Sequence, residues 1–417
     1  MWTRKFSIGL SLLSIVVLMG VFASQGAAID GRAGEEIKTV AELKELEQKG
    51  LLTHGQVLSF EELIEDFGKT IPIVETTDRS LERTSTRGHR EWTEKRKGMA
   101  SVAENNALVN HKGGGYPFPD VTKDDPKAGI KAFWNFEYLC NGDDFRQVGW
   151  QYFLTDTKGN IKELAGDSSR LYWGGRTDME PVPEIGNNTE ELWYKYIINF
   201  TKPFASKGLA QLEVKYIDPN KLQDLWVFVP GLRRITRVGA GNRCDCLGGF
   251  VFNQDDANMW SGNSTLFNYE LLEEKELLVN TLWSEEQWQS RKGIVPSAHF
   301  TLPILEKRTV WKIKQTPKDP NYCYSKRIYY SDPETWHLVW MEMYDRSGEL
   351  WKTEQQVFSL FPQPESQGGS GIMCNVQGDT LDFKIYEGGP YYQNDVRFNE
   401  GLEQGLFSLD ALRRAGR

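Results

Sequence analysis

Alternating apolar and polar positions, which begin near residue 130, predict a protein built mainly of β-strands. In 209–217 the apolar residues Leu212, Val214 and Tyr216 alternate with polar ones. A period of two is typical of a strand with one buried face. Further strands are expected at 145–155, 169–174, 192–201, 224–238, 308–315, 324–331, 335–344 and 381–387.

Short turn sequences separate several of these strands. Thr157–Asn160 and Arg346–Glu349 each contain a glycine among polar residues, which is typical of a hairpin connection. Strands joined by hairpins are antiparallel neighbours. Since the chain shows no regular alternation of strands with helices, we do not expect a doubly wound parallel sheet.

Two expected strands carry apolar side chains on both faces. In 335–344, alternation places Trp336 and Trp340 on one face and Met341 on the other, and 224–229 has the same character. A sheet with one face in water would alternate more strictly. One face must therefore pack against helices, and the other must be covered or must line a cavity.

The N-terminal part has a helical pattern instead. Apolar residues at helical spacing from Val40 to Leu46 predict one helix, and Ser59–Glu62 matches a capping box that would begin a second. We therefore expect a helical segment over 29–110, followed by a β-rich part over 111–417.

The first 28 residues have the pattern of a secretory signal peptide. Arg4 and Lys5 precede an uncharged apolar run over 6–22, and the small residues Gly26 and Ala28 stand at the positions of a signal-peptidase site. The run is at the short limit for a membrane-spanning helix, so we expect cleavage. The mature protein is then predicted to work outside the cytoplasm.

Composition narrows the choice of partners. The chain has 49 Lys and Arg against 58 Asp and Glu, which argues against a nucleic-acid partner because such binding depends on neutralising phosphates. Fourteen Trp, sixteen Tyr and twenty-one Phe make the chain rich in aromatic residues. Aromatic residues on both faces of a sheet indicate either a thick core or a hydrophobic groove.

Five cysteines follow the signal: Cys140, Cys244, Cys246, Cys323 and Cys374. In an oxidising compartment we expect at least one disulfide, and the odd number leaves at least one thiol unpaired. Cys244 and Cys246 are too close in sequence for an easy mutual bridge, so each could pair with a distant cysteine. The pairing stays open.

The sequence lacks the motifs of common enzymes. Its five histidines form neither a His-Glu-x-x-His nor a His-x-His pattern, and no Gly-x-Ser-x-Gly elbow or phosphate-binding Gly-x-x-x-x-Gly-Lys loop occurs. We therefore predict a non-enzymatic protein, with no catalytic residue, no metal ligand and no cofactor.

Two longer motifs carry a family resemblance. They are the Pro-Gly-x-Arg-Arg run within 225–241 and the Tyr-Asp-x-x-Gly-x-Leu-Trp run within 326–352. The sequence resembles a proteobacterial family of unknown function that is labelled outer-membrane lipoprotein-sorting-protein-like. Further similar segments spread the resemblance over nearly all of the mature chain: 114–138, 253–263 and 407–417.

The resemblance implies the fold of the periplasmic lipoprotein carriers LolA and LolB. That fold is α+β: a strongly curved antiparallel sheet forms an unclosed half-barrel over helices, and its concave face binds acyl chains. The resemblance also implies a place in the periplasm or at the outer membrane. An exporter of the resistance-nodulation-division (RND) class and an outer-membrane protein are implied as partners, because family members are often encoded beside them.

We therefore predict a periplasmic carrier of a hydrophobic, lipid-like ligand, acting in envelope lipid or lipoprotein traffic. The alternative is a non-catalytic envelope adaptor whose sheet encloses a filled core. The candidate ligand-binding residues are large apolar side chains of the expected strands: Trp226, Phe228, Trp311, Tyr330, Trp336, Leu338 and Trp340.

Three charged residues are candidates for a polar rim. Arg233 and Arg234 are neighbours in a strand and should point to opposite faces, so one should face inward and meet a carboxylate or an acidic headgroup. The alternative places both in solvent. Glu342 interrupts an apolar face, and an unpaired buried carboxylate is costly, which favours the open end of a groove. The competing interpretation pairs Glu342 with a buried arginine.

Overall fold

The computed structural model describes residues 28–239, 243–246, 250–290, 299–367 and 369–415. The predicted signal peptide lies outside this part of the chain, apart from Ala28. Over the described ranges, no helix combines the length and the apolar character needed to cross a membrane.

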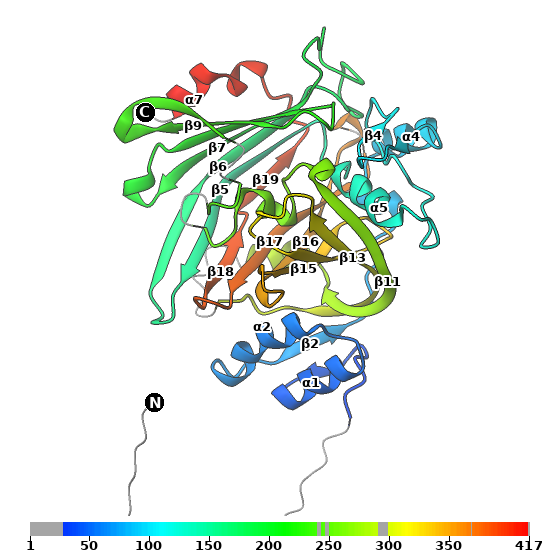
Figure 1. The fold of residues 1–417 in the computed structure, drawn as a ribbon, viewed down its shortest axis with the longest axis vertical. Helices are drawn as coiled ribbons and strands as arrows, with labels where there is room; N and C mark the ends of the chain where they lie inside the picture. Colours follow the sequence, from blue (N-terminus) through cyan, green and yellow to red (C-terminus); the bar gives the residue numbers. More distant parts are fainter. Residues whose placement is uncertain (1–27, 240–242, 247–249, 291–298, 368, 416–417) are drawn as a thin grey trace, which may run out of the picture.

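Most strands form one continuous sheet, in which the long strands pair antiparallel with their neighbours (Figure 1). From one edge to the other the strands pair in this order: β11 (Phe267–Asn280), β13 (Leu305–Pro317), β14 (Lys326–Ser331), β15 (Leu338–Tyr344), β16 (Leu350–Pro362), β17 (Gly371–Asp382), β18 (Glu387–Tyr392) with β19 (Asp395–Phe398), β5 (Asp144–Thr155), β6 (Ile161–Tyr172), β7 (Leu192–Lys202), β8 (Ala210–Tyr216), β9 (Asp224–Val229) and β10 (Arg234–Val238). Among the described residues the edge strands β10 and β11 do not pair, so the sheet stays unclosed.

Short strands complete the sheet. β1 (Glu36–Ile37) pairs with β2 (Ile71–Val74), and β2 runs parallel to the start of β13. β12 (Leu282–Trp283) lies parallel to β16. A separate two-stranded sheet joins β3 (Ser101–Val102) to β4 (Leu108–Val109).

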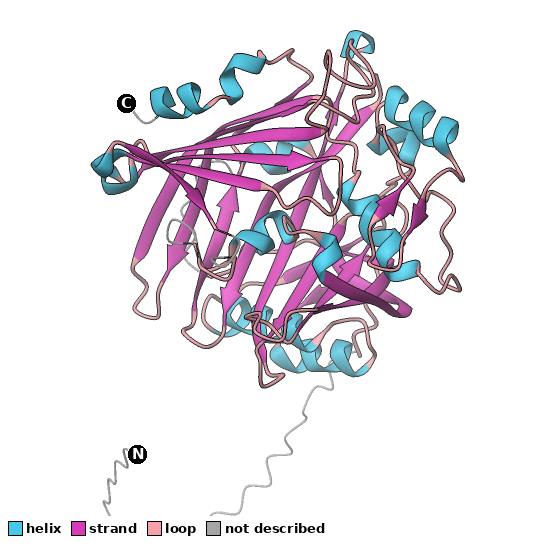
Figure 2. Ribbon diagram, turned by 45° about the horizontal axis from the view of Figure 1, so that its top comes forward, coloured by secondary structure: helices cyan, strands magenta, loops and turns pink. Residues whose placement is uncertain are grey.

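Most helices lie around the sheet (Figure 2). The α-helices are α1 (Val40–Gln48), α2 (His54–Glu65), α3 (Leu81–Thr84), α4 (Arg87–Arg96), α5 (Ala128–Glu137), α6 (Glu285–Ser290) and α7 (Leu409–Ala415). In Figure 1, α1 and α2 lie at the bottom, α4 and α5 at the right and α7 at the top. A mainly β protein with an unclosed sheet is the fold class that the sequence predicts.

The helix predicted from Ser59 begins earlier than expected. Thr53 caps α2 and forms a capping box with Gln56, so the first turn precedes Ser59. The Ser59 hydroxyl lies inside the helix and donates to the carbonyl of Gly55 at 2.7 Å. A capping box of the same kind, Thr-x-x-Gln, stands six residues earlier and begins the helix there.

Both faces of the β13–β15 region are buried, as the two-faced apolar pattern predicts. On one face Trp340 packs against Phe60 of α2, with ring centroids 6.0 Å apart. On the other face Tyr329 packs against Phe133 of α5, with centroids 5.0 Å apart. This part of the sheet is therefore a filled core between two helical layers.

The predicted alternation in 335–344 is wrong at its start. Val339 is an extra residue, because Trp340 pairs with Tyr330 whereas Leu338 pairs with Ser331. Such a bulge reverses the face of the residues before it. Leu338 therefore packs in the apolar cluster that contains Phe133, the cluster of α5. Trp340 packs in the cluster that contains Phe60, the cluster of α2.

Two other strand predictions need correction. The expected strand at 381–387 crosses the turn between β17 and β18, which leaves Ile385 54% exposed. The expected strand at 224–238 splits in two at a short 3-10 helix, Pro230–Leu232, because proline cannot donate to a strand ladder. Arg233 follows with a left-handed φ of 50° and turns the chain into β10.

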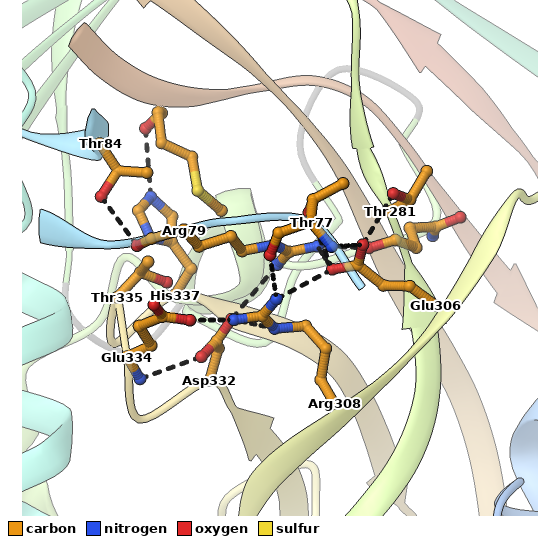
Figure 3. A network of polar contacts seen from close by, with 12 residues as sticks. Thr77, Arg79, Thr84, Thr281, Glu306, Arg308, Asp332, Glu334, Thr335 and His337 are labelled. Atoms are coloured by element: carbon orange, nitrogen blue, oxygen red, sulfur yellow. Dashed lines mark hydrogen bonds and ion pairs between the residues drawn. The ribbon is translucent and has the colours of Figure 1, made fainter. Parts of the chain in front are cut away.

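A buried network of charges ties the N-terminal segment to the sheet (Figure 3). Arg79, between β2 and α3, is fully buried and contacts Glu306 of β13 at 2.8 Å and Asp332 at 3.3 Å. Arg308 contacts the same two carboxylates, at 3.1 and 2.8 Å, and also pairs with Glu334. Opposite charges thus alternate through the network, as buried charges require.

One disulfide joins Cys244 to Cys323. Cys140 and Cys374 are buried free thiols, and Cys246 is an exposed one. The expectation of at least one disulfide is confirmed, and Cys244 does pair with a distant cysteine rather than with Cys246.

Candidate ligand-binding site

Two adjoining cavities lie where β5–β8 face the segment 250–261. We call them the aromatic cavity, of about 140 Å³, and the polar cavity, of about 130 Å³. We call the segment 250–261 the covering segment. The two cavities share a wall to which β5, β6 and the covering segment contribute: Gln147, Arg170, Ala257, Asn258 and Ser261.

Aromatic rings form most of the apolar wall of the aromatic cavity. Trp150 and Phe200 meet edge to face, with centroids 5.3 Å apart. From the covering segment, Phe250 lies 4.9 Å from the ring of Tyr152 and stacks on Phe252 at 4.7 Å. Aromatic pairs in these geometries attract one another beyond the area that they bury. The rings therefore form a preformed apolar wall.

Polar contacts and the disulfide fix the covering segment. Asp256, in the 3-10 helix Gln254–Met259, accepts hydrogen bonds from the hydroxyl of Tyr324 and from Arg327, both at 2.7 Å. The Met259 amide donates to Glu354 at 3.1 Å. The Cys244–Cys323 disulfide anchors the chain just before this segment. The cavity wall is therefore held to β14 and β16 at several points.

Arg170 of β6 stands at the junction of the two cavities. Its guanidinium lies 4.7 Å from the ring centre of Tyr194, 4.8 Å from that of Tyr196 and 5.3 Å from that of Phe145. It donates to the hydroxyl of Tyr172 at 3.4 Å, whereas its Nε is buried and has no hydrogen-bond partner. No ion pair of Arg170 with a described carboxylate is found.

Two buried carboxyl groups also line the aromatic cavity. Burial raises the pKa of Glu354 well above its usual range, and repulsion from Asp256 acts in the same direction. Burial also raises the pKa of Glu213, although the positive charges of Lys215 and Arg170 oppose the change. The Glu213 carboxyl accepts from the Tyr194 hydroxyl at 3.1 Å. Both environments favour the neutral acid.

The polar cavity contains an internally paired set of charges. Lys215 contacts Glu137 of α5 at 2.7 Å. Burial lowers the pKa of His337 to about 4, so its ring is neutral near neutral pH. Lys215 thus contacts a carboxylate, whereas Arg170, the cation at the junction, contacts none among the described residues. No group of three or more His, Cys, Asp or Glu side chains suited to a metal occurs in the described ranges.

Comparisons with known proteins place this chain in a family. A family model described as a protein of unknown function, DUF1329, matches residues 45–413. The chain belongs to this family. The match covers most of the chain and confirms the resemblance drawn from the sequence motifs.

Individual proteins of known sequence or structure are also similar to this chain. An uncharacterized protein of Pseudomonas aeruginosa is 23% identical over 251 residues, which are 57% of this chain and 52% of that protein. The match thus spans about half of that relative's length. Among solved structures, a DUF1329 family protein from Desulfovibrio piger has a TM-score of 0.51 at 15% identity, over 70% of this chain and all of the other.

A second structure, from Vibrio parahaemolyticus, is named for an outer-membrane lipoprotein-sorting protein domain. It has a TM-score of 0.50 at 18% identity and covers 70% of this chain and all of its own. A LolA superfamily protein from Nitrosomonas europaea has a TM-score of 0.41 at 16% identity, over 66% of this chain and 94% of its own. The likeness to the Vibrio structure confirms the predicted fold class.

The structure does not bring the seven predicted ligand-binding residues together. Trp311, Trp336 and Leu338 pack in the cluster of α5, Tyr330 and Trp340 in that of α2, and Trp226 and Phe228 in that of α7. Leu338 alone of the seven lines one of the two cavities described above. The prediction that Trp336 and Trp340 share one face is wrong, because the bulge at Val339 separates them. Ligand binding by the seven residues stays a prediction.

The predicted polar rim is also corrected. Glu342 is buried beside α2, where it accepts from the Tyr344 hydroxyl at 2.8 Å and from the Gly55 amide at 3.3 Å. A hydroxyl and a helix N-terminal amide thus replace both the open groove end and the buried arginine that were considered. Arg233 and Arg234 are both exposed, and neither forms an ion pair with a described residue.

Apart from Leu338, sequence reasoning missed the residues that line the two cavities. Tyr196, Ile198 and Phe200 alternate in β7 and share one face, a signal present in the predicted strand 192–201. Arg170 gave no such signal, because a single arginine in a strand is ordinarily a solvent-facing residue. Its environment depends on β7 and on the covering segment, which are distant in sequence.

Proposed function

We propose that this protein binds a hydrophobic, lipid-like ligand in the periplasm and serves envelope lipid or lipoprotein traffic. The observation that carries the proposal is the preformed aromatic cavity between β5–β8 and the segment 250–261. The fold shared with a lipoprotein-sorting domain supports it. The proposed mechanism is passive burial and needs no catalytic residue.

The size of the aromatic cavity sets how much ligand it can bury. A dry cavity of about 150 Å³ accommodates a molecule the size of benzene. The aromatic cavity of about 140 Å³ therefore suits the end of an acyl chain or one ring. Burying each CH₂ contributes about 0.8 kcal/mol, so a segment of about five carbons contributes roughly 4 kcal/mol before binding costs. Reversible binding of this strength suits a carrier that must release its ligand.

Delivery is the part of the proposal that involves other proteins. In it, an RND-family exporter and an outer-membrane protein are the partners that supply and receive the ligand. The alternative, an envelope adaptor without a ligand, is favoured by one observation: helices fill both faces of the β13–β15 region. Detection of a bound ligand separates the carrier from the adaptor.

The test is native mass spectrometry of protein purified from the periplasm. We expect wild-type protein to carry a lipid-like molecule that Ile198→Trp loses, because the larger side chain fills the aromatic cavity. The matched control is Ile197→Trp, on the opposite face of the same strand. Protein that never carries a ligand would favour the adaptor, and equal retention by both variants would place the ligand elsewhere.

A further inference from the structure

We propose that Arg170 binds the anionic headgroup of an amphiphile whose apolar part enters the aromatic cavity. The inference rests on the proposed function and names the class of ligand: an anionic group, carboxylate or phosphate, attached to a hydrocarbon tail.

The first support is the position of Arg170. It lines both cavities, so a group bound to it has an apolar compartment on one side and a polar compartment on the other. An amphiphile has the same division between tail and headgroup. The tail would lie against rings such as Trp150 and Phe250, and the headgroup would lie at the shared wall.

The second support is the unused hydrogen-bonding capacity of Arg170. A guanidinium offers five N–H donors in a planar fork. Only one long hydrogen bond, 3.4 Å to the Tyr172 hydroxyl, is found for it among the described residues, and the buried Nε has no partner. Carboxylate and phosphate oxygens match this fork in two parallel bonds.

The third support is that the aromatic rings orient the cation without neutralising it. Tyr194, Tyr196 and Phe145 all lie within 5.3 Å of the guanidinium, counted from their ring centres. Contacts of this kind stabilise the charge but leave the N–H groups free. Arg79 and Arg327, which are fully buried, are built differently, because each contacts a carboxylate directly.

The other charged groups around the cavities do not reverse the sign. Glu137 is paired with Lys215. Burial raises the pKa values of Glu213 and Glu354, which favours their neutral forms. The junction therefore attracts an anion rather than a cation.

The test compares ligands that share a ten-carbon tail and differ in the headgroup. Isothermal titration calorimetry at neutral pH would use decanoate, decyl phosphate, decan-1-ol and decyltrimethylammonium, together with tail-free inorganic phosphate. We expect at least one of the two anionic amphiphiles to bind about tenfold more tightly than decan-1-ol, because a hydrogen bond to a charged group exceeds a neutral one. The better of the two identifies the headgroup.

The variant Arg170→Gln should lower the ratio of the affinity for the preferred anionic amphiphile to that for decan-1-ol about tenfold, to near one. Arg170→Lys keeps the charge but not the fork and should retain part of the preference. The matched control is Arg146→Gln on the neighbouring strand β5, whose side chain is exposed. Near-ultraviolet circular dichroism of each variant would verify that the aromatic packing is intact, and Arg170→Lys serves as the deciding variant if Arg170→Gln is not folded.

The possible failures are distinguishable. Equal affinities for decanoate, decyl phosphate and decan-1-ol would overturn the headgroup assignment but leave the proposed function intact. Tightest binding of decyltrimethylammonium would overturn the sign of the site. Inorganic phosphate binding as tightly as decyl phosphate would overturn the role of the tail. Absence of binding by every probe would overturn both the assignment and the proposed function.

Discussion

At the scale of single residues, burial of a charged group has several solutions in this protein. The carboxylate of Glu342 meets a hydroxyl and a helix amide, and Arg79 meets two carboxylates. Glu354 differs, because one of its oxygens accepts from Met259 while the other is buried without a partner. A neutral acid suits such a site better than an anion does.

This difference predicts how Glu354 affects stability with pH. Its pKa in the folded protein is raised above the ordinary value of 4.5, so the folded state holds the proton more tightly than the unfolded state does. The contribution of Glu354 is fully present below the ordinary pKa and is lost as pH rises toward the folded-state pKa. We therefore expect Glu354→Gln to gain stability relative to wild type as pH increases through this range.

Urea unfolding at a series of pH values measures this effect. Glu276→Gln, an exposed position on β11, is the control and should follow wild type at every pH. A constant difference between Glu354→Gln and wild type would mean that Glu354 ionises normally in the folded protein.

At the scale of elements, hairpin-connected strands could be predicted from sequence and the covering segment could not. Period-two alternation identified β7 and β8, because neighbouring residues settle it. β11 escaped prediction because its middle, 273–276, is charged and its apolar residues gather at the two ends. The segment 250–261 shows no periodicity in its sequence. Contacts with Arg327 of β14 and Glu354 of β16 fix its conformation.

The disulfide makes this segment an element with a testable role. Cys244 and Cys323 are 79 residues apart, and closing a loop of that length is worth about 4 kcal/mol in the chain-entropy model. We expect Cys323→Ser to lose stability of this order and to release ligand more readily, because the cavity wall loses an anchor. Thermal unfolding and probe titration measure the two effects.

Cys246→Ser is the matched control, because Cys246 is an exposed free thiol in the same stretch of chain. It should behave as wild type in both measurements. If Cys323→Ser lost stability but bound probes with unchanged affinity, the disulfide would matter for folding and not for the cavity wall.

At the scale of the whole molecule, the N-terminal segment is part of the main core. The sequence predicted a helical segment over 29–110 from its periodicity, which is a local property. Its attachment depends on contacts distant in sequence, such as Phe60 with Trp340 and Arg79 with Glu306 and Asp332. Local pattern carries no information about such partners.

The attachment predicts that this segment and the sheet unfold together. Arg79→Met would leave Glu306 and Asp332 with one arginine, Arg308, in place of two (Figure 3). Removing one partner from a buried charge network costs about 3–5 kcal/mol. We expect Arg79→Met to lose stability of this order. The control Arg83→Met should change the stability little, because Arg83 is exposed and lies outside the network.

The transition itself is the sharper readout. Because α2 packs directly on β15 and β16, we expect urea curves followed by tryptophan fluorescence and by far-ultraviolet circular dichroism to coincide in wild type and in Arg79→Met. An early transition in circular dichroism, before the change in fluorescence, would show that the helical segment detaches first. In that case Arg79 would hold a separable unit to the sheet, and the core shared by α2 and β15 would contribute less to stability than its burial indicates.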